Sequence, residues 1–107
     1  NTHKEKQVSH TQSIEVQCFP LYSILLALGK THIDYFSLDI EGAEMAVLNT
    51  IPFNKVYINV MSVEYKTVGN KTGVSNKIKE LRQFFNGTGL YEEVELGKLD
   101  IFVKRIK

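Results

Sequence analysis

Two apolar stretches that each end at a carboxylate constrain the fold of this chain more than any other feature. Residues 33–40 and 56–65 are rich in β-branched and aromatic side chains, and residues 41–50 between them carry apolar side chains at helical spacing. A strand, a helix and a second strand within about thirty residues form the βαβ unit of a parallel sheet. Ligands of open α/β sheets bind beyond the carboxyl ends of the strands, so we expect any site there.

The segment before this unit predicts a short strand and a short helix. Residues 14–18 alternate apolar and polar side chains, which is typical of a half-buried strand. Residues 20–28 follow with helical spacing, and Gly29 would close that helix. Residues 1–13 are polar and are expected to form a loop or a frayed segment, which leaves 14–107 as the folded part.

The segment after the unit predicts a helix and a hairpin. Ser75 could cap the helix, and Lys77 is expected on its water-facing side. Strands at 90–96 and 99–105 are separated by only two residues, which is hairpin spacing. The predicted fold class is therefore α/β, with a mostly parallel sheet, central at 33–40, that ends in an antiparallel hairpin.

Composition excludes some classes of partner. The 107 residues include 13 Lys and Arg against 12 Asp and Glu, a net charge of +1. This net charge is too small to attract nucleic acid or an anionic membrane strongly, and we expect no nucleic-acid partner. A single cysteine, Cys18, cannot form an internal disulfide.

Asp39 is the first candidate site residue, and it has two interpretations. It could act as a general base or a metal ligand at the bend between strand and helix, where the helix N-terminus favours the ionised carboxylate. It could equally be an N-cap that accepts bonds from the backbone N–H groups of Gly42 or Ala43. Gly42 is costly inside a helix, and a close approach by a ligand or strand would explain its presence.

Three more carboxylates surround this bend. Glu41 and Glu44 fall in the first turn of the expected helix, where the dipole favours them, and for Glu44 a structural role is expected. Glu64 would lie beside Asp39 if the two strands are neighbours, and together they could take a substrate proton or bind a divalent cation. The alternative for Glu64 is pairing with Lys66 or Lys71.

The motif at residues 39–44 carries a resemblance to a known family. With the strand before it, Val47 and Leu48 after it, and the later strand end at 63–65, this Asp-x-Glu-Gly-x-Glu segment resembles the FkbM-type methyltransferase domain. The resemblance implies the C-terminal half of a Rossmann-like S-adenosylmethionine methyltransferase fold, whose last strand inserts antiparallel to the others. It also implies catalytic roles for Asp39, Glu41 and Glu64, with no metal site assigned.

The cofactor is implied by the family and not by residues of this chain. Enzymes of this fold hold S-adenosylmethionine with a glycine-rich turn after the first strand and an acidic residue ending the second. Neither is present in these 107 residues, so the residues that bind the cofactor are unknown and the chain is expected to be a fragment of the domain.

Three functions stay open, and with them the question of whether the protein is an enzyme. The first is O-methyl transfer to a small molecule or sugar. The second follows from a similarity to the animal branch of the family with Star-like trafficking proteins, which implies a non-catalytic module that binds membrane cargo in the secretory pathway. N-glycosylation sequons at 70–72 and 86–88 favour it slightly. The third is a structural remnant without activity of its own.

Overall fold

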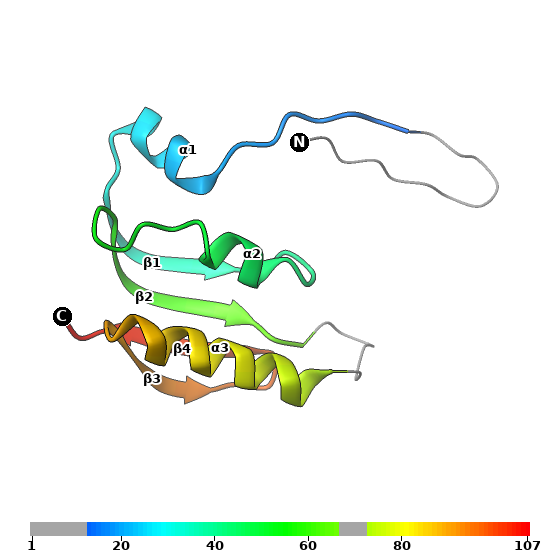
Figure 1. Cartoon of the computed structure of the whole chain (residues 1–107), viewed down its shortest axis with the longest axis vertical. Helices are drawn as coiled ribbons and strands as arrows, with labels where there is room; N and C mark the ends of the chain where they lie inside the picture. The colour runs from blue at the N-terminus through cyan, green and yellow to red at the C-terminus, as the bar shows by residue number, and fades with distance from the viewer. Residues whose placement is uncertain (1–12, 67–72) are drawn as a thin grey trace.

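A computed structural model of the chain describes residues 13–66 and 73–107 (Figure 1). Three helices accompany one mixed sheet in this part of the chain. In chain order the elements are α1 (Leu21–Leu28), β1 (His32–Leu38), α2 (Glu44–Leu48), β2 (Tyr57–Glu64), α3 (Val74–Thr88), β3 (Tyr91–Leu96) and β4 (Asp100–Arg105). Within the described ranges, no helix has the length and apolar character that crossing a membrane requires.

The strand order of the sheet is β1-β2-β4-β3. β1 and β2 are parallel, which confirms the predicted βαβ unit, while β4 lies between β2 and β3 and is antiparallel to both. The last strand therefore inserts antiparallel into the sheet, as the family resemblance implies. The predicted mostly parallel sheet is confirmed in part: the described sheet is mixed, with one parallel pair among its three strand pairs, and β4 alone runs opposite to the other three strands.

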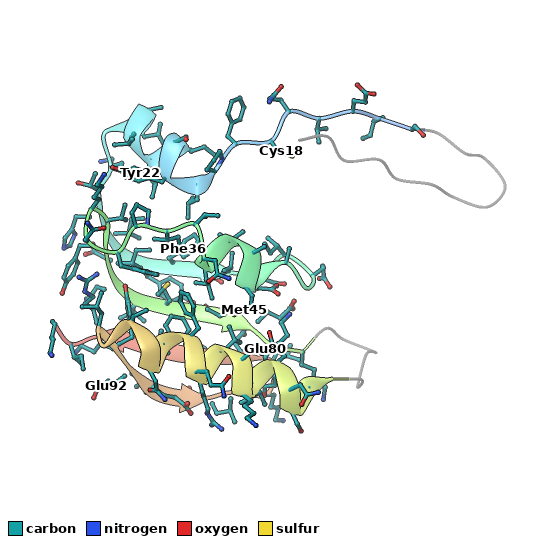
Figure 2. All side chains as sticks on the ribbon, in the orientation of Figure 1. Cys18, Tyr22, Phe36, Met45, Glu80 and Glu92 are labelled. Carbon is teal, nitrogen blue, oxygen red and sulfur yellow. The ribbon has the colours of Figure 1, made fainter. Side chains whose placement is uncertain are left out.

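β2 is the central element of the hydrophobic core. Ile58, Met61 and Val63 are almost completely buried, and α3 covers the sheet with Leu81 and Phe85. The half-buried side chains of Phe36 and Met45 complete the packing on the α2 side (Figure 2). This core fixes β2, and through it the strand end at Glu64.

The N-terminal side of the sheet differs from the prediction. Residues 14–18 form no strand, and Ile14 and Val16 are exposed, because no described strand lies beside them to supply hydrogen-bond partners. The helix after them is confirmed as α1, closed by Gly29 in the left-handed conformation. β1 is an edge strand of the described sheet and not a central one, with Tyr35 55% exposed.

The helix starts also depart from the prediction. α2 begins three residues later than expected, because Glu41 and Gly42 have φ angles of 58° and 109°, which no α-helix contains. A Cβ on Gly42 would meet no described atom within 4 Å, so no strand approaches it closely, and its positive φ explains the glycine. The N-cap of α3 is Gly73 and makes no side-chain bond, so the predicted Ser75 cap is wrong.

Candidate functional site

The parallel pairing of β1 and β2 brings two carboxylates to one edge of the sheet. Leu38, the last residue of β1, pairs with Val63, so Asp39, which follows β1, lies beside Glu64, the last residue of β2. The arrowheads of both strands point to the same edge in Figure 1. The expected neighbourhood of Asp39 and Glu64 is confirmed.

Glu41 joins this pair to form an acidic cluster of Asp39, Glu41 and Glu64. One carboxylate oxygen from each of the three residues lies within 4.8 Å of the others. Asp39 and Glu41 are exposed, whereas Glu64 is buried. The cluster therefore has an open side and a buried wall, and the three residues predicted as catalytic from the sequence are those that the fold brings together.

Glu64 is the member of the cluster whose pKa is strongly shifted. Burial raises the pKa of its carboxyl, and the neighbouring Asp39 raises it further by accepting a hydrogen bond from the protonated acid and by its negative charge. The charges of Glu41 and Glu44 act in the same direction, and the pKa reaches about 7. Glu64 can therefore exchange a proton near neutral pH.

The turn between β1 and α2 positions Asp39 and Glu41 through Glu44. The Glu44 carboxylate accepts hydrogen bonds from the backbone N–H groups of Ile40, at 2.9 Å, and Gly42, at 3.1 Å. Gly42 therefore donates to Glu44, and no side chain caps α2, so the N-cap interpretation of Asp39 is wrong. Asp39 therefore does not cap the helix. Glu44 has the structural role expected of it, because it binds the N–H groups of the turn.

Lys77 of α3 completes the contacts of Glu44. Its ammonium group donates a 2.6 Å hydrogen bond to Oε1 of Glu44, whose side chain is fully buried. Burial alone would raise the pKa of Glu44, but the bonds from Lys77, Ile40 and Gly42 outweigh it and hold the pKa below its ordinary value. The prediction that Lys77 faces water is wrong, because the side chain is turned toward this buried carboxylate.

Glu64 has no lysine partner in the described part of the chain. Its predicted alternative, an ion pair with Lys66, is absent, and Lys71 lies outside the described residues. Oε1 of Glu64 is buried and accepts no hydrogen bond from a described residue. Ion pairing among these residues therefore does not account for a carboxylate at this position.

Sequence reasoning missed Asp100 as a neighbour of the cluster. Asp100 begins β4 and pairs in register with Glu64 across the antiparallel strands. Burial raises the pKa of Asp100, and the charge of Asp39 adds to the increase. The hairpin spacing predicts the strand that contains Asp100, but it does not predict that this strand lies beside β2. Only that placement brings Asp100 to the edge with the cluster.

The turn after β1 does not fit the carboxylate end of S-adenosylmethionine. Its N–H groups at Ile40 and Gly42 already donate to Glu44, and its outward side chains, Asp39 and Glu41, are acidic. A turn that cradles an anion instead presents free N–H groups to the ligand. The turn after β1 therefore supplies no cradle for the cofactor.

Comparison with known families agrees with the sequence motif. Residues 1–94 match the Methyltransferase FkbM domain. The range includes the whole acidic cluster, and β4, which follows it, pairs with β2 in the same sheet. No curated protein and no solved structure matches the chain. Because the matched range covers most of the 107 residues, the chain belongs to the FkbM methyltransferase family.

Proposed function

We propose that this chain forms the acceptor side of an S-adenosylmethionine-dependent O-methyltransferase. The observation that carries the proposal is the acidic cluster, because it gathers three carboxylates at the carboxyl ends of β1 and β2. Glu64 has a pKa of about 7, and a general base is most effective when its pKa lies near the working pH. The acceptor would be a small molecule or a sugar with a free hydroxyl.

The three carboxylates would divide the work by their exposure. Asp39 and Glu41 are exposed and can accept hydrogen bonds from the hydroxyl groups of an incoming acceptor. Ionised Glu64, at the buried wall, would take the proton that the reacting hydroxyl loses as its oxygen gains the methyl group. S-adenosylmethionine supplies that methyl group when bound, and residues outside the described part of this chain would hold it.

A second candidate is a non-catalytic module of the Star-like type that binds membrane cargo in the secretory pathway. Two observations favour it. Asn86, the acceptor position of the sequon at 86–88, is exposed on α3 and open to glycosylation, and the turn after β1 supplies no cofactor cradle. In this case the acidic cluster would have no part in catalysis.

Calorimetry of the full-length protein with S-adenosylmethionine separates the two candidates. The enzyme proposal predicts saturable binding of the cofactor, and binding that survives Asp39→Asn, because Asp39 acts on the acceptor. Asp34→Asn serves as the matched control, since Asp34 lies on β1, the strand before Asp39, with a side chain that is 93% exposed. An absence of cofactor binding in the wild-type protein would refute the enzyme proposal and leave the cargo-binding module.

A further inference from the structure

We propose that Asp39, Glu41 and Glu64 form a binding site for a divalent cation such as Ca²⁺. The juxtaposition of three carboxylates from two strand ends, one of them buried without a described partner, supports the proposal. The sequence alone leaves a divalent cation as one of two possibilities for Asp39 and Glu64 and assigns no metal site. The inference stands whether or not the protein transfers methyl groups.

The spacing of the carboxylate oxygens allows all three residues to bind one cation. One oxygen from each residue lies within 4.8 Å of the other two. Ca²⁺ binds oxygen at about 2.3–2.6 Å, so two ligands on opposite sides of the ion are about 4.6–5.2 Å apart. The three oxygens therefore lie close enough together to bind one Ca²⁺ ion. Mg²⁺ demands near-ideal octahedral geometry and loses its waters reluctantly, so an open cluster of three carboxylates suits Ca²⁺ better.

The second observation is the buried oxygen of Glu64. The residue is only 6% exposed, and Oε1 accepts no hydrogen bond from any described residue. A buried carboxylate oxygen without a partner is costly, and proteins ordinarily pair such an oxygen with a donor or a cation. Because the Glu64 carboxylate belongs to the cluster, a cation bound there can supply the missing partner.

The charges around the cluster leave the position open to a cation. Lys77, the nearby cation that the fold does supply, is taken by the buried carboxylate of Glu44. Asp39, Glu41 and Glu64 make no ion pair with a lysine or arginine of the described residues. Carboxylate oxygens are the hard ligands that Ca²⁺ prefers, so the donor type matches the ion as well as the spacing does.

The proposed site is accessible from solvent, and its three carboxylates form only part of a full set of ligands. Asp39 and Glu41 face solvent, so an ion can enter without a movement of the core. Three carboxylates supply fewer oxygens than the six to eight that Ca²⁺ takes, so water or a hydroxyl of another molecule would fill the remaining positions.

Calorimetric titration of the metal-free full-length protein with CaCl₂ tests the site. We expect saturable binding of one ion, a higher melting temperature in Ca²⁺ than in a chelator, and weaker binding of MgCl₂. Asp39→Asn and Glu64→Gln should each weaken Ca²⁺ binding by at least about tenfold, because each removes a charged ligand. A single coordinating carboxylate is removed in each variant without a change in side-chain size.

Matched controls and two outcomes decide the result. Asp34→Asn and Glu92→Gln make the same chemical changes at exposed positions, and Glu92 lies at the end of the sheet away from the β1 and β2 arrowheads (Figure 2). Both should bind Ca²⁺ as the wild type does. No binding by the wild-type protein up to about 10 mM Ca²⁺ would overturn the proposal, since even weak protein sites bind near 1 mM. Equal losses in cluster and control variants would overturn it too.

Discussion

The ammonium group of Lys77 on α3 donates a 2.6 Å hydrogen bond to the fully buried carboxylate of Glu44 on α2. The same carboxylate accepts hydrogen bonds from the backbone N–H groups of Ile40 and Gly42. A single buried acid thus ties α3 to the turn that presents Asp39 and Glu41. The geometry of the acidic cluster therefore depends on an ion pair outside it.

Replacement of Lys77 should destabilise the fold. Lys77→Ala would leave the buried charge of Glu44 with backbone donors alone, and we expect the free energy of unfolding to fall by about 1–3 kcal/mol. Lys79→Ala is the matched control, because Lys79 is exposed on the same helix and should change stability by less than about 0.5 kcal/mol. Urea denaturation measures both, and equal effects would show that the ion pair contributes nothing.

Two glycines should respond oppositely to alanine. Gly42 has a φ of 109°, so Gly42→Ala should cost about 1 kcal/mol or more through backbone strain. Gly87 lies within α3, and a Cβ there meets no atom within 4 Å, so Gly87→Ala should add about 0.5–1 kcal/mol. Thermal denaturation compares the two variants, and a stable Gly42→Ala variant would contradict the described turn.

Glu64 should make stability depend on pH. The pKa of its carboxyl is about 7 in the folded protein and 4.5, the ordinary value, in the unfolded chain. Between these pH values the native state therefore binds more protons than the unfolded state. The free energy of unfolding therefore decreases as pH rises from 4.5 to about 7. In Glu64→Gln this decrease is absent, so between pH 4 and pH 8 the variant should gain about 3 kcal/mol of stability relative to wild type.

The pH series is measured by urea denaturation in the presence of a chelator, so that no divalent cation is bound. Glu92→Gln, at an exposed position, should follow the wild-type curve at every pH. A difference between wild type and Glu64→Gln that stays constant with pH would show that Glu64 titrates normally.

The sequence predicts the part of the fold that local pattern controls. Strand-forming stretches around one short helix predict the parallel pair β1 and β2, and their register then brings Asp39 beside Glu64. Residues 14–18 have a strand pattern too, but a strand needs a neighbour to bond to, and the alternation of side chains cannot say whether one is present. The late start of α2 at Glu44 depends on positive φ angles at Glu41 and Gly42. A positive φ at a glutamate cannot be predicted from the sequence, because non-glycine residues rarely adopt one.

The contacts of the site depend on tertiary structure and were harder to foresee. Helical spacing put Lys77 on the polar side of α3, and only the packing of α3 shows that a buried acid lies there. Asp100 reaches the cluster edge because β4 inserts beside β2. Sequence patterns describe each element alone, whereas these two contacts require knowledge of which elements are neighbours.

Methyl transfer by the full-length protein tests the central claim, that the corner formed by Asp39 and Glu64 receives the acceptor. The assay follows the labelled methyl group of S-adenosylmethionine into a panel of sugars and small hydroxyl compounds. We predict transfer by wild type and Asp34→Asn, and a loss of at least about 100-fold in Asp39→Asn and Glu64→Gln with cofactor binding retained. Wild-type rates in the two cluster variants, or no transfer by the wild-type protein, would contradict the account.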